Sequence, residues 1–290
     1  MLLRLLRSEF YRLTRRWMPW ILLAFIVVIA FLFYFLIYVS VNAQLQAIKS
    51  GTIPAPPGGT EQLDATLRQI APDRVAEFGV GLVAGLGGVM LIVFAASHVG
   101  TEFGWGTFRT LLAHGASRSG FLVSKAVSLL LYALAFMIVG TLAAIGASYT
   151  VSAVAGISAG GGIDLAEVAR VAGKSAYTFV PYMALALAIS VWSKSAGAGI
   201  AAGLVVYFAE GLVATILVSL NKDYAQIVNW GLSRNASALT RTAGGPAAQD
   251  PTASTLPDAT QAAIVLAVYT AIFLALAYWR LRSRDVTVGG

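Results

Sequence analysis

The sequence contains no cysteine and few charged residues. Only 11% of its 290 residues are Asp, Glu, Lys or Arg, whereas soluble domains carry about 25%. Without cysteine, the chain cannot form disulfides, iron–sulfur clusters or thiolate metal sites. Hydrophobic residues make up 58% of the chain, and the mean hydropathy is +0.77. We therefore expect an all-α membrane protein.

The motifs of common enzyme active sites are also missing. A phosphate-binding Walker loop reads Gly-x4-Gly-Lys-[Ser/Thr], and the nearest match, Gly173-Lys174-Ser175, has Val168 at the first glycine position. Neither an HExxH nor a Ser-His-Asp pattern occurs, and the only histidines are His98 and His114. We therefore expect no enzyme activity and no metal or cofactor bound by this chain. His98 and Glu102 share a helix face, either as two metal ligands or as a polar pair at an interface.

Six apolar segments reach the roughly 20 residues that a membrane span requires. They cover about residues 18–41, 78–98, 124–150, 173–193, 197–219 and 262–281. We expect residues 18–290 to form a six-helix transmembrane domain with one long cytoplasmic segment, 99–123. The predicted outer loops are 42–77, 151–172 and 220–261.

Basic residues are distributed unevenly over these loops. With both termini inside, the inner face carries twelve basic and three acidic residues, a net charge of +9, and the outer loops carry eight and nine. This positive-inside asymmetry predicts cytoplasmic termini. The Ala/Gly-rich composition suggests the plasma membrane of a bacterium. Membrane topology then explains the net charge of +7, and no nucleic-acid partner is expected. A DNA-binding arm at residues 4–16 is the alternative.

Residues 1–17 have the pattern of an amphipathic helix. Apolar residues recur at helical spacing between arginines: Leu2, Leu3, Leu6, Phe10, Leu13 and Trp17. This pattern predicts an interfacial elbow helix on the inner membrane surface, followed by a bend at Met18-Pro19. A solvated basic N-terminus is the alternative.

Small and ionisable residues interrupt two of the predicted spans. Gly81 and Gly85 form a small-xxx-small pair, which predicts close helix packing, with pore lining as the alternative. Glu210 lies near the middle of the fifth span, where an ionisable group costs about 3 kcal/mol or more. We expect it to line a translocation path or a dimer interface. The alternative is a protonated carboxyl bonded to a neighbouring helix.

The largest polar island between two apolar runs is residues 98–125. Its helix-compatible, amphipathic sequence at a membrane boundary indicates a surface that another protein binds. The residues that carry this prediction are Glu102, Gly106, Thr107, Arg109, Arg118 and Lys125.

The chain resembles the permease subunits of ABC exporters of the ABC-2 superfamily. Their first inner loop reads as an acid, Gly-Thr-x-Arg, Leu-Leu, Ser-Arg and then Lys; the matching residues here are Glu102, Gly106-Thr107-Phe108-Arg109, Leu111-Leu112, Ser117-Arg118 and Lys125. Residues Pro181–Ala198 resemble the family's fourth span and its Lys/Ser turn. Residues Trp230–Leu239 are similar to its last outer loop, although Ser233 replaces a common proline.

This resemblance implies a transport subunit with a coupling helix in the 99–123 segment. That helix would dock on a separate ABC-type ATPase that binds ATP and Mg. Paired with a second permease copy or a related permease, the chain would move a lipophilic or amphipathic substrate outward by alternating access. Arg109 and Arg118 have a second interpretation, contact with lipid headgroups. Two other functions stay open: a membrane scaffold or sensor that docks an ATPase without carrying substrate, and an ATP-independent secondary carrier.

Overall fold

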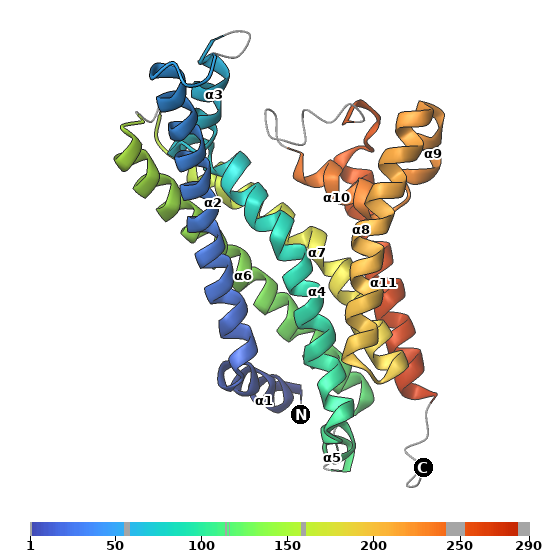
Figure 1. The fold of residues 1–290 in the computed structure, drawn as a ribbon. Helices are drawn as coiled ribbons and strands as arrows, with labels where there is room; N and C mark the ends of the chain where they lie inside the picture. The colour runs from blue at the N-terminus through green and yellow to red at the C-terminus, as the bar shows by residue number, and fades with distance from the viewer. Residues whose placement is uncertain are drawn as a thin grey trace.

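The computed structural model describes residues 2–54, 59–113, 115, 117–157, 161–241 and 253–283, and every regular element in these ranges is helical (Figure 1). Six helices are long and apolar enough to cross a membrane, which confirms the predicted all-helical, six-span class. They are α2 (Trp17–Lys49), α4 (Val80–Gly104), α6 (Arg118–Ala155), α7 (Leu165–Ser193), α8 (Ala196–Leu220) and α11 (Ala259–Arg282).

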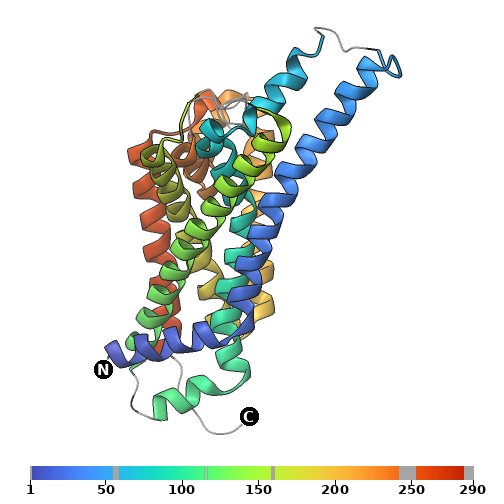
Figure 2. The ribbon, with the colours of Figure 1, turned by 90° about the vertical axis from the view of Figure 1, so that its left-hand side faces the viewer.

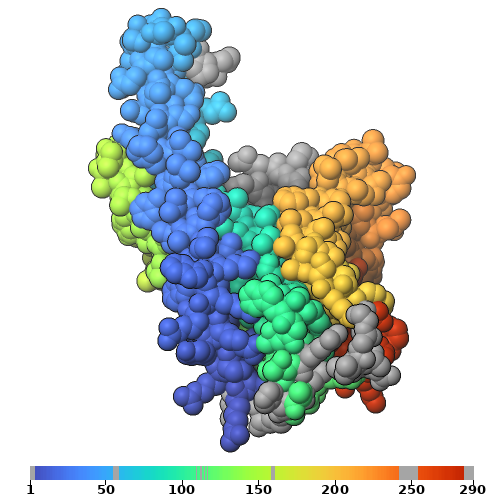
Figure 3. Space-filling view, turned by 60° about the horizontal axis from the view of Figure 1, so that its bottom comes forward, coloured from blue at the N-terminus to red at the C-terminus, as the bar shows by residue number. Residues whose placement is uncertain are grey.

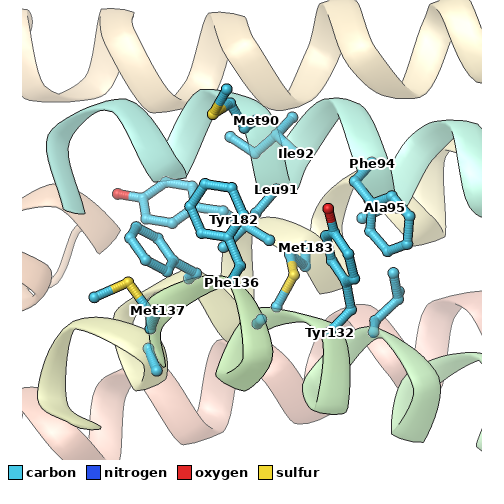
Figure 4. Close-up of a cluster of buried hydrophobic side chains, with 14 of the residues drawn as sticks. Met90, Leu91, Ile92, Phe94, Ala95, Tyr132, Phe136, Met137, Tyr182 and Met183 are labelled. Carbon is cyan, nitrogen blue, oxygen red and sulfur yellow. The ribbon is translucent and has the colours of Figure 1, made fainter. Parts of the chain in front are cut away.

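The interior of the bundle is built from α4, α6 and α7. The most apolar window of α7 is 78% buried, whereas those of α2 and α8 are 17% and 11% buried. Aromatic and aliphatic side chains of the three inner helices interlock in the core, as Figure 4 shows for Phe94, Phe136 and Tyr182. Since α2 packs on α6, and α8 and α11 pack on α7, their outward apolar faces are left to contact lipid.

The two ends of the bundle carry different short helices. Helix α1 (Leu2–Arg15), α5 (Thr107–Ala113) and the last turn of α11 lie at one end, which we call the α5 end. The α10 end carries α3 (Glu61–Gln69), α9 (Ala225–Val228) and α10 (Leu232–Thr240). At the α5 end, α1 runs across the bundle and α5 lies beyond it (Figure 2).

The chain turns between α1 and α2 at Arg16, whose backbone is extended (φ −82°, ψ 138°). Pro19 lies in the first turn of α2, where its missing N–H costs no helical hydrogen bond. The bend therefore precedes the predicted Met18-Pro19. Tyr132 of α6 donates a hydrogen bond of 2.8 Å to the Pro19 carbonyl and so fixes the start of α2.

Two of the predicted outer loops contain more helix than expected. The short helices η1 (Pro72–Arg74) and η2 (Val75–Gly79) lead directly into α4. Within residues 220–261 the chain forms η3 (Lys222–Tyr224), α9, α10 and η5 (Ala253–Thr255). Helix α10 packs back against α7, α8 and α11, so this segment is partly a component of the bundle.

Candidate functional site

A cluster of ionisable side chains is buried at the α5 end, where α1 crosses α4 and α6. Glu9, Glu102 and Lys125 are each at most 1% exposed, and His98 is 3% exposed. Arg12 and Arg16 close the cluster from the side of α1. We call these six residues the ionic cluster. Ionised groups are rarely so deeply buried unless they are paired.

Lys125 is the centre of the ionic cluster. Its ammonium group has three protons to donate, and three acceptors surround it: Glu9 Oε2 at 2.8 Å, Glu102 Oε1 at 3.1 Å and the His98 carbonyl at 3.3 Å. One side chain of α6 thus bonds to both α1 and α4. Removing either carboxylate would leave the buried ammonium group incompletely compensated.

Arg12 of α1 and Arg16 of the following turn complete the coordination of the two carboxylates. Arg12 lies 2.9 Å from Glu9 and donates to both oxygens of Glu102 at 3.2 Å. Arg16 reaches Glu102 at 3.2 Å, and its guanidinium lies 5.2 Å from the centre of the Trp105 ring. Three cations therefore meet two carboxylates, and ion pairs hold α1 to α4.

Glu9 is the acid that ties α1 to the bundle interior. Burial by itself raises the pKa of its carboxyl group, but the hydrogen bond from His98 and the charge of Lys125 outweigh burial and lower the pKa to about 2. His98 Nε2 lies 3.4 Å from Glu9 Oε2 and 3.2 Å from Ser128 Oγ. His98 and Glu102 therefore bind separate partners, as an interfacial pair does. His114 lies outside the described residues.

The structure separates the predicted coupling residues into two groups. Glu102 and Lys125 are buried in the ionic cluster and present no surface to a partner. Gly106 and Thr107 form the turn into α5, and Gly106 has a positive φ of 70°, which glycine adopts without strain. Arg109 lies within α5, but its side chain is outside the described part of the structure.

Aromatic contacts anchor α5 to the bundle. The ring of Phe108 lies 5.0 Å from Phe103 of α4 and 5.0 Å from Phe121 of α6, centre to centre. Trp105, at the turn, is 71% exposed. The short helix is thus fixed on one side and open on the other.

Arg118 has a role that its sequence context did not reveal. Its Nη1 donates to the carbonyl oxygens of Leu281 and Arg282 at 2.9 and 2.7 Å. Carbonyls in the last turn of a helix lack intrahelical partners and attract cations. Arg118 therefore joins the start of α6 to the end of α11.

Glu210 is half-buried in α8 and points to α10. Its Oε1 accepts a hydrogen bond of 3.1 Å from the backbone N–H of Ser233, in the first turn of α10, where backbone donors are free. A carboxylate is favourable at a helix N-terminus. Within the single chain, Glu210 therefore bonds to a neighbouring helix and fixes α10 against α8.

The packing predicted for Gly81 and Gly85 is wrong. A Cβ atom built at either position meets no atom within 4 Å. Close packing occurs instead at Gly100, where an added Cβ would collide with the backbone of Ala196 and lie 2.7 Å from its Cβ. The spacing rule identified small residues on α4 but not which of them touch a neighbouring helix.

A family model described as a protein of unknown function (DUF2705) matches residues 83–287, more than two thirds of the chain. The chain belongs to this family. The DUF2705 match includes His98, Glu102 and Lys125 but not α1, which supplies the other half of the ionic cluster. No curated protein matches the chain.

Sequence reasoning missed Glu9, Arg12 and Arg16 as partners of the DUF2705 region. The signal was present: Glu9 is the only acid among the five arginines of residues 4–16. Acidic residues are almost never fully buried unless they are paired, but Glu9 also has Arg12 on its own helix as a partner. Lys125 could not be identified from the sequence, because it lies 116 residues away.

Proposed function

We propose that this protein is the membrane permease subunit of an ATP-driven exporter of the ABC-2 type, with α5 as its coupling helix. The observation that carries the proposal is the position of α5: a short helix between two spans that protrudes beyond α1 at one end of the bundle (Figure 2). A cytosolic ATPase can move membrane helices only through such a protruding, rigidly attached element.

The attachment of α5 supports this role. Helix α4 runs unbroken over 25 residues from Val80 to Gly104, a length of about 37 Å at 1.5 Å per residue. Its last turns are held to α1 and α6 by the ionic cluster, and Phe108 packs between Phe103 and Phe121. A push on α5 is therefore transmitted to α4 rather than absorbed in a flexible loop.

The partner would be an ABC-type ATPase that supplies the phosphate-binding loops and binds ATP and Mg. The excess of basic residues at the α5 end supports a cytoplasmic location for both termini and for α5. The host membrane would be a bacterial plasma membrane. Exposed Trp105 offers the type of aromatic anchor that dominates protein interfaces.

A second permease, identical or related, would complete the pathway. Large apolar side chains are exposed along α2 and α8, among them Phe31, Phe35, Phe208 and Leu212. Part of this surface would contact the second permease and the rest would contact lipid. Substrate would then move outward by alternating access, and the largely apolar walls favour a lipophilic or amphipathic substrate.

The test is the ATP hydrolysis that accompanies the purified chain. Full-length tagged protein from native membranes should carry an ATPase. Combining Trp105→Ala with Ala113→Glu should weaken that association about tenfold or more, because it removes an exposed aromatic anchor and adds a charge to the open side of α5.

The control is Trp230→Ala at the α10 end, where the tryptophan is similarly exposed (62%). This variant should keep the associated ATPase activity. No associated ATPase in the wild type, or equal loss in both variants, would contradict the proposal. An ATPase that binds through α5 but never supports transport in liposomes would identify a scaffold.

A further inference from the structure

A cavity of about 430 Å³ opens among α4, α7, α8 and α10, in the half of the bundle nearest the α10 end. Its volume falls in the range of small-molecule sites, about 300–1,000 Å³. The α4 wall is formed by Gly81 and Gly85, whose missing side chains leave the space open. Figure 3 shows α4 (green) at the molecular surface between α2 (blue) and α8 (yellow).

Three of the hydroxyl groups that line the cavity already donate their protons to the backbone. Thr178 donates its proton to the carbonyl of Ser175 at 2.8 Å, and Thr240 donates to the carbonyl of Ala236 at 2.9 Å. Tyr207 donates to the carbonyl of Gly85 at 3.4 Å. Each proton is therefore used on the backbone, and the remaining lone pairs can only accept. These three groups can accept hydrogen bonds from a ligand.

The charged residue among the described lining residues of the cavity is acidic. Glu77 lines it, and no Lys, Arg or His is among its described lining residues. Arg74 pairs with Glu77 at 3.2 Å from outside, but Arg74 is half exposed and also lies 4.0 Å from Asp73. Glu210 adds a second carboxylate behind Ser233, another lining residue. The surroundings therefore favour a cation.

Aromatic rings form the deeper wall. Phe179, Tyr182 and Tyr207 all line the cavity, and the rings of the two tyrosines meet edge to face at 5.1 Å. Aromatic faces attract organic cations and also pack against apolar groups. The cavity thus combines hydrogen-bond acceptors, the carboxylate of Glu77 and aromatic surface.

We propose that this cavity binds an organic cation: a protonated amine attached to an apolar or aromatic body. The amine would donate to Glu77 and the hydroxyl oxygens, and the body would pack on the aromatic wall. The inference does not rest on the proposed transport activity, because binding is measured on the purified chain alone.

The experiment is equilibrium binding of dansylcadaverine, a fluorescent primary amine, to the full-length chain in nanodiscs. Its N-acetylated form keeps the same aromatic body without the charge and serves as the matched ligand. The wild type should bind the amine at least about tenfold more tightly than the acetylated form, since hydrogen bonds from a charged donor are stronger than those from a neutral one.

Gly85→Leu should fill the cavity without a backbone collision and weaken amine binding at least about tenfold. Gly173→Leu is the control, because Gly173 has equally open surroundings on α7 but does not line the cavity. Glu77→Gln, a rim variant that leaves the helix packing alone, should reduce the preference for the amine over the acetylated form. Equal binding of the two ligands by the wild type, or full amine binding by Gly85→Leu, would overturn the inference.

Discussion

The two polar regions of this bundle, the ionic cluster at the α5 end and the cavity at the α10 end, use polar groups in opposite ways. In the ionic cluster, Lys125 is fully buried and uses all three of its protons on protein acceptors. In the cavity, the lining hydroxyls of Thr178 and Thr240 donate to the backbone and can still accept a hydrogen bond. Charge that is fully paired holds helices together, whereas unpaired acceptors are free to bind a ligand.

Helix α4 connects the two regions. Gly81 and Gly85 face the cavity, and 17 residues further along Glu102 enters the ionic cluster, a separation of about 25 Å along the helix axis. The same rigid helix then leads into α5. A ligand-dependent shift at the cavity would therefore reach the proposed docking helix without passing through a flexible segment.

The largest expected difference between the regions is the effect of removing one charge. Lys125→Met should reduce the free energy of unfolding by about 3–5 kcal/mol, because it leaves two buried carboxylates with fewer partners. Glu77→Gln at the cavity should cost less than about 1 kcal/mol, since its partner Arg74 is half exposed. Chemical denaturation in detergent measures the free energy of unfolding of both variants.

Arg7→Ala, an exposed change on α1, controls for the loss of positive charge. A Lys125→Met protein as stable as the wild type would show that the ionic cluster does not hold the α5 end.

Acid should weaken the ionic cluster through Glu9. Its pKa is lowered from 4.5 to about 2 in the fold, so the unfolded chain binds the proton first as the pH falls. The stability that ionised Glu9 contributes, about 3 kcal/mol, is complete above pH 4.5 and is lost progressively toward pH 2. The stability gap between the wild type and Glu9→Gln should therefore narrow over this range. A gap that stays constant from pH 5 to pH 2.5 would exclude this linkage.

A smaller contrast concerns two glycines of the same helix. Gly100→Ala should cost about 1–3 kcal/mol, because its Cβ collides with the backbone of Ala196. Gly85→Ala should be neutral or stabilising by up to about 1 kcal/mol, because its Cβ enters open space and alanine favours the helix. Thermal unfolding of the two variants side by side measures the difference. Equal melting temperatures would contradict the difference between crowded surroundings at Gly100 and open surroundings at Gly85.

The fold was largely predictable because its signals are local. Long apolar runs produce the six spans, and the basic amphipathic sequence at the N-terminus forms α1. The ionic cluster was not predictable in the same way. Glu9 and Lys125 meet only after three helices pack, and no local pattern links them. The glycine spacing also could not distinguish Gly85 from Gly100, because neighbouring helices, not α4, decide which glycine is crowded.

In the proposed mechanism, α4 couples the cavity to an ATPase bound at α5. The most direct test is ATP hydrolysis by the purified complex in liposomes, with and without dansylcadaverine. The amine should change the hydrolysis rate of the wild type, while Gly85→Leu should keep the basal rate and lose the response. A rate that is independent of the amine, or a full response in Gly85→Leu, would contradict the claim.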